Sequence, residues 1–388
     1  MTVAYDTAIY IGRFEPVHHA HLALLRQALA SARQVIVVIG SAWQARSPRN
    51  PFTWQERADM LRQALPEAER ARLQLLPVRD YYDEPVWAQA VRRGVAALTA
   101  PGARIALVGH FKDATSNYLR SFPGWQLIPL PRQGDIDAST LRDAYFGAAP
   151  AAQASTAPNA AQHAPTNADL ATDPATTLAA VDAALLPWKE HIPPATLAFL
   201  RDFAQKPEYA ALQHEWRVLR DYRASWASAP YPPVFVTVDA VLRCQEHVLV
   251  IRRAHAPGKG QLAVPGGFIE QKETLWQSCL RELAEETHCA LPEAALRAAL
   301  RQVQVFDHPE RSQRGRTITH AHYFDLGTAP FPAVQADDDA LQAQWLPIAA
   351  LAGMEDQFFE DHFHILDRFL GLTDAAELAR SLSDFGRR

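Results

Sequence analysis

The sequence predicts an α/β protein of two domains, the first built on a parallel sheet and the second on a mixed sheet between helices. Its 388 residues exceed what one ordinary hydrophobic core accommodates. A run from Gly147 to about Ala184 is rich in Ala, Pro and Thr and poor in large apolar residues. The pattern of apolar residues also differs on the two sides of this run. We therefore expect a first domain at 1–146, a flexible linker at 147–184, a helical connector at 185–231 and a second domain at 232–388.

In the first domain, short apolar runs alternate with helical patterns. Strands are expected at 8–11, 35–39, 73–78, 105–108 and 127–130, and helices are expected to begin near His21, Thr53, Pro85 and Ser139. Thr53 and Glu56 have the spacing of a capping box. Alternation of this kind predicts a mostly parallel sheet covered on both faces, with ligands at the carboxyl ends of its strands.

The connector and the second domain have a different pattern. Apolar residues recur at helical spacing between Ile192 and Trp226, which predicts two helices. Beyond them we expect strands at 234–242, 247–251, 303–306 and 317–326, a glutamate-rich helix after the second strand, and a closing helix at 358–370. This order predicts an α/β/α layer with a mixed sheet.

Composition excludes several classes of protein. A net charge of -5 and a pI near 6.3 argue against a nucleic-acid binder with a general basic surface. No stretch approaches 18 uncharged apolar residues, and the N-terminus lacks a signal-peptide pattern. The three cysteines, Cys244, Cys279 and Cys289, form no C-x-x-C pair. We expect a cytoplasmic protein with small-molecule partners, no nucleic-acid or membrane partner, and an oligomeric state that the sequence leaves open, including a homo-oligomer.

The glutamate-rich helix carries the first chemical signal. Glu282, Glu285 and Glu286 are related by i, i+3 and i+4, so they lie on one helical face. The opposite face is apolar, with Trp276, Cys279, Leu280 and Leu283. Crowded carboxylates are stabilised by a hard cation such as Mg²⁺ or Mn²⁺. Three glutamates alone, however, are more often a solvated acidic face.

The frame around these glutamates is more specific. Gly267 is followed after five residues by Glu273, and after seven more by the run from Arg281 to Glu286. This frame resembles the Nudix box, whose proteins hydrolyse nucleoside diphosphates linked to another group. The resemblance implies Glu282, Glu285 and Glu286 as metal ligands, with Glu282 and Glu286 catalytic, Glu273 as an auxiliary catalytic carboxylate, and Arg281 orienting a glutamate. His288 stands where the family usually has glycine, so we expect a shifted helix end with the ligands intact.

An arginine-rich segment downstream bears on the substrate. The run from Phe306 to Thr317 resembles the F-D-x-P-x-R-x-x-R-G-R segment of ADP-ribose pyrophosphatases. Its arginines are expected to bind phosphate or ribose, although they could also only solvate the loop: Arg311, Arg314 and Arg316. The runs 337–339 and 359–362 also resemble proteins that fuse this hydrolase to an adenylyltransferase. The catalytic base stays open between a box glutamate and a later carboxylate such as Glu360.

A second chemical signal follows the first strand. The run from Gly12 to His21 places Arg13, His18 and His21 at an expected helix start, where free N–H groups favour phosphate. An isolated H-x-x-H is more often only a histidine-rich turn. Later, Ser139 is placed to cap a helix, and Arg142 follows one turn in, where a guanidinium grips phosphate.

Together these motifs resemble the H-x-G-H and I-S-x-T-x-x-R signatures of the Rossmann-like nucleotidyltransferase superfamily, with Ala20 in place of a glycine and 137–139 in place of a Ser/Thr-rich triplet. Further pieces in the same order resemble nicotinamide mononucleotide (NMN) adenylyltransferase, in which Gln usually stands at Glu15. The resemblance implies ATP- and substrate-binding roles for Gly12, Arg13, Phe14, Asn50, Trp87, Gly109 and Ser139, and catalytic roles for His18, His21 and Arg142. Trp87 is equally well explained as a platform for the nicotinamide ring or as a core aromatic.

The sequence therefore predicts a bifunctional enzyme of NAD metabolism. The first domain would form NAD and pyrophosphate from ATP and NMN with Mg²⁺, and the second would hydrolyse ADP-ribose to AMP and ribose 5-phosphate. One alternative keeps both sites but gives the first another phosphorylated substrate, such as phosphopantetheine. Another is a regulator that senses an NAD-derived ligand without cleaving it.

Overall fold

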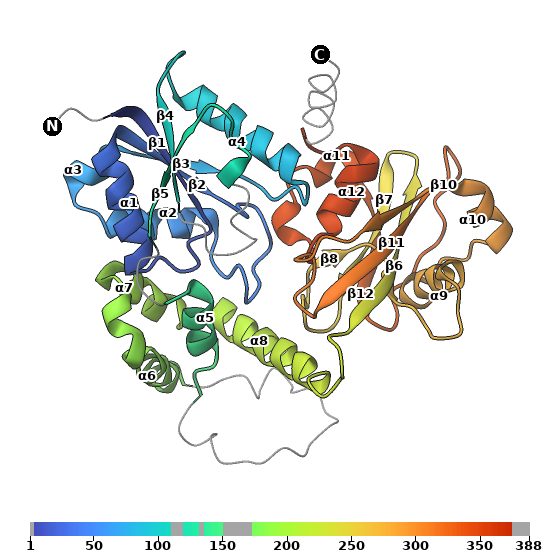
Figure 1. The fold of residues 1–388 in the computed structure, drawn as a ribbon. Coiled ribbons are helices and arrows are strands. Elements are labelled where there is room, and N and C mark those ends of the chain that lie inside the picture. Colours follow the sequence, from blue (N-terminus) through green and yellow to red (C-terminus); the bar gives the residue numbers. More distant parts are fainter. Residues whose placement is uncertain (1–3, 110–118, 132–135, 150–172, 375–388) are drawn as a thin grey trace. The chain divides into compact units, whose positions relative to one another are not determined.

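The computed structural model describes residues 4–109, 119–131, 136–149 and 173–374. The chain divides into two compact units, one of residues 1–80 and 87–217 and one of residues 81–86 and 218–388. Each unit has its own sheet, as Figure 1 shows. Within the described residues, no helix is long and apolar enough to cross a membrane.

The first unit contains the predicted parallel sheet. All of its pairings are parallel, and the strand order is β3-β2-β1-β4-β5. The strands are β1 (Tyr5–Gly12), β2 (Ala32–Ile39), β3 (Leu73–Pro77), β4 (Ile105–Gly109) and β5 (Gln126–Pro129). All five predicted strands are confirmed to within a few residues. The order reverses beside β1, and ligands of such sheets bind at this point, at the carboxyl ends of the strands.

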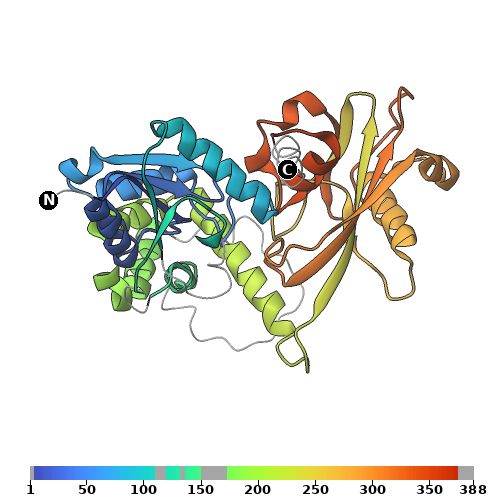
Figure 2. The same ribbon diagram turned by 45° about the horizontal axis from the view of Figure 1, so that its top comes forward.

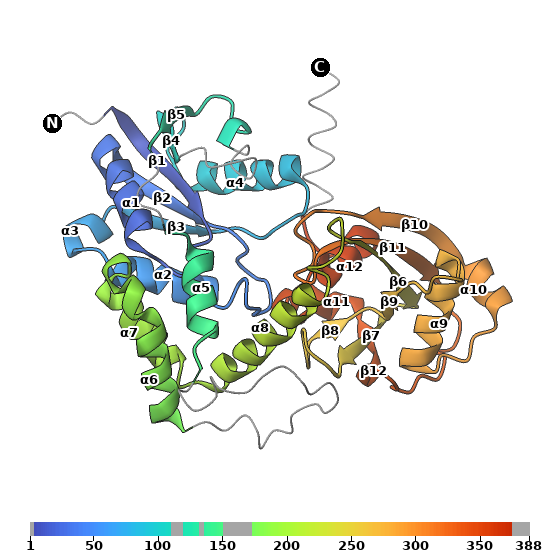
Figure 3. The same cartoon turned by 60° about the horizontal axis from the view of Figure 1, so that its bottom comes forward.

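Helices cover both faces of this sheet. They are α1 (His19–Ser31), α2 (Trp54–Gln63), the short α3 (Glu67–Arg70), α4 (Glu84–Leu98) and α5 (Ala138–Phe146). Residues of α1, α2 and α5 share one core with alternate residues of β1 and β2, whereas α4 lies on the opposite face (Figure 3). The predicted capping box of α2 is confirmed, since Glu56 N donates to Thr53 Oγ1 at 3.3 Å and Thr53 N donates to Glu56 Oε2 at 2.8 Å.

The connector forms more structure than predicted. Its helices are α6 (Pro174–Leu185), η3 (Leu186–His191), α7 (Pro194–Phe203) and α8 (Pro207–Ser225). The prediction of a flexible linker through 184 is wrong for α6, because Val181 and Leu185 are buried in the first unit's core and Asp173 caps the helix. Residues 150–172 of that linker lie outside the described part. The two helices predicted between Ile192 and Trp226 are α7 and α8.

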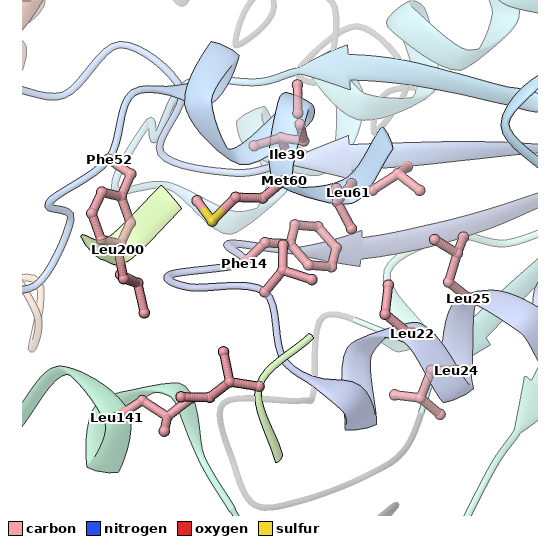
Figure 4. Close-up of a cluster of buried hydrophobic side chains, with 14 of the residues drawn as sticks. Phe14, Leu22, Leu24, Leu25, Ile39, Phe52, Met60, Leu61, Leu141 and Leu200 are labelled. Carbon is pink, nitrogen blue, oxygen red and sulfur yellow. The ribbon is translucent and has the colours of Figure 1, made fainter. Parts of the chain in front are cut away.

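Helix α7 packs against a loop early in the chain. The ring of Phe52 lies 5.2 Å from the ring of Phe199 and 5.2 Å from that of Phe203, both edge to face. Leu200 lies beside Phe52 in the same core, as Figure 4 shows. Edge-to-face aromatic pairs add stabilisation beyond the area that they bury. Helix α7 is therefore an integral part of the first unit.

The second unit contains the predicted mixed sheet. Its main strands are β6 (Val234–Cys244), β7 (His247–Arg253), β10 (Leu300–Phe306), β11 (Arg316–Asp325) and β12 (Ala340–Pro347), in the order β10-β11-β6-β7-β12. Strands β6 and β11 are parallel and the other neighbours are antiparallel. Two short strands, β8 (Leu262–Ala263) and β9 (Gly266–Phe268), pair with β7 and β6.

Helices lie on both faces of the second sheet, which confirms the α/β/α layer (Figure 2). On one face are α9 (Leu275–Thr287) and α10 (Glu293–Ala299), and on the other are α11 (Ile348–Leu351), the turn η4 (Glu355–Gln357) and α12 (His362–Leu370). The predicted apolar stripe of α9 packs on the sheet. The closing helix begins at His362 rather than at Phe358, because Phe358 bridges to Leu262 and Glu360 has a left-handed backbone, φ 44°.

Candidate active sites

The histidine turn of the first unit lies between β1 and the start of α1. The rings of His18 and His21 stack with centroids 3.7 Å apart, and His18 N donates to His21 Nδ1 at 3.3 Å. His18 is buried, and burial lowers its pKa to about 4, although the charge of nearby Asp137 acts in the opposite direction. The imidazole of His18 is therefore neutral near pH 7.

Helix α5 reaches this turn from a distant part of the chain. Arg142 Nη1 donates to the main-chain oxygen of Glu15 at 2.6 Å. Burial is the main cause that lowers the pKa of Arg142, to about 10, so the guanidinium stays charged. The structure thus brings together three residues predicted to be catalytic: His18, His21 and Arg142.

Two predicted nucleotide contacts in this unit lie elsewhere than expected. Phe14 is buried in the core with its ring 5.4 Å from that of Tyr10, and a Cβ at Gly12 would lie only 2.8 Å from the Phe14 ring (Figure 4). Glycine at position 12 therefore makes room for this ring. Ser139 is not the helix cap that was predicted. Asp137 occupies the N-cap, and Ser139 is exposed within the first turn of α5.

The other predicted contacts are spread along the unit. Asn50 is buried, and its Nδ2 donates to Gln44 Oε1 at 2.5 Å. Trp87 is half-buried on α4, with its ring 5.9 Å from that of Phe122. Gly109 ends β4, where a Cβ would lie 2.9 Å from Leu119. Residues 110–113, which follow Gly109, lie outside the described residues.

In the second unit, Arg281 connects the glutamates of the box. Its Nε donates to Glu273 at 3.0 Å, and its Nη1 donates to Glu282 Oε1 at 2.8 Å and to Glu285 Oε2 at 2.9 Å. Ser278 Oγ also donates to Glu273, at 2.7 Å. One arginine thus pairs with three carboxylates on and beside α9.

Glu286 lies apart from this arginine and deeper in the unit. Its side chain is 3% exposed, and its Oε2 accepts the N–H of Gly266 at 2.9 Å. Burial, aided by the charge of Glu282, raises the pKa of Glu286 to about 8, and burial also raises that of Glu282. In the described part of the chain, no group of three or more His, Cys, Asp or Glu side chains is arranged to hold a metal ion.

The donor set nevertheless fits a divalent cation. Carboxylate oxygens are the ligands that Mg²⁺ and Mn²⁺ prefer. Burial, aided by neighbouring carboxylates, raises the pKa values of Glu282 and Glu286, and a bound cation would stabilise their ionised forms. The backbone of β9 also passes close to one of these carboxylates. A Cβ at Gly267 would lie 2.5 Å from Glu282 Oε1, so only glycine lets β9 pass beside this carboxylate.

His288 is the C-cap residue of α9. This residue adopts the left-handed conformation itself, φ 46° and ψ 31°, and its N–H donates to Ala284 O at 2.9 Å. The predicted shift of the helix end is therefore not needed. The imidazole Nε2 lies 2.8 Å from Asp337 Oδ2, which ties the 337–339 run to the end of the helix.

The three arginines of the loop after β10 lie in different environments. The prediction that Arg311 binds substrate is wrong, because its side chain is 4% exposed and forms a buried ion pair with Asp361. Arg314 lies with its guanidinium carbon 4.9 Å from the Phe268 ring, and Arg316 Nη1 donates to the main-chain oxygen of Asp307. Glu360, one option for the base, accepts from Ser312 Oγ and Gln313 N at 2.9 Å each.

Sequence reasoning also missed two groups beside the box. Asp239 on β6 is buried under Gly266, with Thr319 Oγ1 donating to it at 2.5 Å, and burial raises its pKa to about 6. Arg253 is the last residue of β7, and its guanidinium carbon lies 4.3 Å from the centre of the Phe359 ring. Its guanidinium group also interacts electrostatically with the carboxylate of Glu286. The sequence signal for Arg253 was its place, with Arg252, at the end of the apolar run 248–251.

The two folds and their sites define a class of protein in which a nucleotidyltransferase-like domain is joined to a Nudix domain. A cytidylyltransferase-like family model matches residues 9–92, and a NUDIX domain model matches residues 233–369. A crystal structure from Francisella tularensis, of a bifunctional NMN adenylyltransferase/ADP-ribose pyrophosphatase complexed with AMP and a manganese ion, is 30% identical. The similarity covers 95% of this chain and 99% of that one, with a TM-score of 0.80. The chain belongs to this bifunctional family.

Relatives of the first unit alone are also found. The nicotinamide/nicotinic acid mononucleotide adenylyltransferase of Acinetobacter baylyi is 35% identical over 143 residues, which is 37% of this chain and 76% of that protein. The nicotinamide-nucleotide adenylyltransferase of Thermococcus kodakarensis is 40% identical over 85 residues, 21% of this chain and 45% of that protein.

Proposed function

We propose that the first unit transfers the adenylyl group of ATP to NMN, giving NAD and pyrophosphate, and that the second hydrolyses ADP-ribose to AMP and ribose 5-phosphate. The observation that carries the proposal is that one chain contains both sites and has a full-length relative that is named as an NMN adenylyltransferase and an ADP-ribose pyrophosphatase. Both reactions break a phosphoric anhydride bond. In the first reaction a phosphate oxygen attacks the phosphorus, and in the second reaction water attacks it.

In the first unit, the residues at the histidine turn position and neutralise phosphate. A phosphate oxygen of NMN attacks the α-phosphorus of ATP, and pyrophosphate leaves with the bonding electrons. His18 and His21 at the start of α1, with Arg13 and Arg142, are proposed to hold the negative oxygens as charge moves to the leaving group. Phe14, whose ring is buried in the core, no longer belongs in this set, whereas Gly12, Asn50, Trp87, Gly109 and Ser139 remain proposed contacts.

In the second unit, Glu282 and Glu286 are proposed to hold Mg²⁺ or Mn²⁺, with Glu285 joining them when it leaves Arg281. The cation supplies an electrophile for the diphosphate and lowers the pKa of bound water. Glu273 and Arg281 set the orientation of Glu282. Arg314, Arg316 and Arg253 are proposed to bind the substrate's phosphates, and the aromatic rings of Phe268 and Phe359 hold two of these arginines in place.

Two incubations of the purified chain test the proposal, one with ATP, NMN and Mg²⁺ and one with ADP-ribose and Mg²⁺ or Mn²⁺, each followed by chromatography. EDTA should stop hydrolysis. Glu286→Gln should abolish only hydrolysis and His21→Ala only NAD formation, while Glu293→Gln, an exposed glutamate on α10, should leave both unchanged. Absence of NAD in the first incubation, or survival of ADP-ribose in the second, refutes the corresponding half.

The same assays separate the alternatives. Adenylylation of phosphopantetheine in place of NMN would move the first unit to another substrate. Binding of ADP-ribose without cleavage would make the second unit a sensor.

A further inference from the structure

Glu15 is a carboxylate enclosed by arginines in the first unit. Both Glu15 and Arg57 are 1% exposed, and Glu15 Oε1 lies 3.1 Å from Arg57 Nε. Glu15 Oε2 accepts the N–H of Phe52 at 3.2 Å. An ion pair this deep has a large desolvation cost, so the charge of Glu15 calls for an explanation beyond packing.

The guanidinium group of Arg57 is hydrogen-bonded to main-chain oxygens. Its Nη1 donates to Arg13 O and Gly40 O at 2.8 Å each, and its Nη2 donates to Ser41 O at 3.0 Å. These bonds join the loops that follow β1 and β2. Arg57 is therefore fixed inside the protein, with its guanidinium group beside Glu15.

Two further arginines lie close to the same carboxylate. Arg142 donates to the Glu15 main chain at 2.6 Å, and Arg13 is two residues away in the sequence. The positive charge of Arg13 lowers the pKa of Arg142, whereas the negative charge of Glu15 raises it. Burial raises the pKa of Glu15 to about 7, whereas the positive charges of Arg57, Arg142 and Arg13 act in the opposite direction and favour its ionised form. Three guanidinium groups thus act on one carboxylate, and those of Arg13 and Arg142 repel each other.

We infer that Glu15 is the resident counter-ion of the adenylyl-transfer site. It holds Arg13 and Arg142 close together while no substrate is bound, and it competes with the substrate's phosphates for them. The ligand class is a polyphosphate anion, such as pyrophosphate or the triphosphate of a nucleotide. The inference rests on the proposed function of the first unit and adds a positioning residue to it.

Glu15→Gln tests this inference because it keeps the shape of the side chain and removes the charge. The amide would also turn an N–H₂ group toward either Arg57 Nε or Phe52 N, both of which are donors. Without ligand, the apparent Tm of the first unit should fall by roughly 5–10 °C. Pyrophosphate, used as the probe, should bind E15Q about three- to tenfold more tightly than wild type, because the competing carboxylate is gone.

The control is Asp6→Asn, at the start of β1. Asp6 also pairs with an arginine, Arg104, at 3.4 Å, but its side chain is 34% exposed and lies at the opposite end of the strand from Gly12. D6N should change neither the Tm by more than about 2 °C nor the affinity for pyrophosphate, since exposed pairs contribute little.

A double variant, E15Q/R142Q, separates charge balance from packing. If Glu15 is a counter-ion, removing one of the repelling arginines should restore part of the lost Tm, and this also decides the matter should E15Q alone fail to fold. The inference is overturned if the double variant is no more stable than E15Q, or if pyrophosphate binds a folded E15Q no more tightly than wild type. If the double variant regains stability but the wild type makes no NAD, the proposed reaction is refuted, and Glu15 remains the counter-ion of an anion site.

Discussion

Arg311 and Asp361 form a bidentate ion pair inside the second unit. Arg311 Nε donates to Asp361 Oδ2 and Arg311 Nη2 donates to Asp361 Oδ1, both at 2.8 Å, and the side chains are 4% and 3% exposed. The pair joins the arginine loop after β10 to the segment that starts α12. Arg311, the first arginine of the run 306–317, therefore stabilises the loop through a buried ion pair.

Removing this arginine should destabilise the second unit. Arg311→Met leaves the carboxylate of Asp361 buried without its partner, which should lower the free energy of unfolding by about 3–5 kcal/mol in denaturant titrations. Arg316→Gln is the matched control, because Arg316 is only half-buried, and should cost less than about 1 kcal/mol. Equal stability of the two variants would contradict the structural role of Arg311.

Gly267→Ala should impair hydrolysis selectively. The new methyl group would lie 2.5 Å from Glu282 Oε1 and would push this carboxylate or β9 away. A displacement of this kind should lower kcat for ADP-ribose by about 100-fold, with NAD formation unchanged. At Gly353, no atom lies within 4 Å of an added Cβ, so Gly353→Ala is the control and should retain both activities.

His288→Gly should leave the second unit nearly as stable as before. Glycine removes the strain of a left-handed residue, and the substitution also removes the exposed ion pair with Asp337, so the two effects nearly offset within about 1 kcal/mol. His288→Val should cost more than about 1 kcal/mol, because β-branched residues disfavour this conformation. Unfolding titrations of both variants measure the difference. A stable His288→Val would show that the helix end can move.

His18 should make the first unit less stable in acid. Because burial lowers its pKa to about 4 in the folded state, below the ordinary value near 6.5, the unfolded chain binds the proton more tightly. Its contribution to stability is complete above pH 6.5 and is lost as the pH falls to 4. Between pH 7 and pH 4, wild type should lose about 2–3 kcal/mol more than His18→Gln. Parallel pH profiles for the two proteins would exclude this titration.

Much of the fold could be predicted because local patterns decide it. The five strands of the first sheet are short apolar runs, and the capping box at Thr53 is a contact between residues three apart. The helix face of Glu282, Glu285 and Glu286 follows from helical periodicity alone. Motifs that come directly after a strand, such as His18 to His21, were also placed correctly at the start of α1.

The remainder depends on contacts between distant residues. Nothing local distinguishes Arg311, which points inward to a carboxylate 50 residues away, from Arg316 in the same loop. Helix α6 is Ala-rich with few large apolar residues, so its burial through Val181 and Leu185 was not visible in composition. Glu15 and Arg57 are separated by 42 positions, and the departure from the family's Gln gave no hint of its partner.

The contact of Phe52 with Phe199 and Phe203 also bears on synthesis of the chain. The loop around Phe52 cannot reach its final packing until the ribosome has released the chain beyond residue 203. At roughly 5–20 residues per second, the nascent first unit waits on the order of ten seconds or more with this aromatic ring uncovered. A chaperone that binds exposed aromatic side chains would have that interval in which to act.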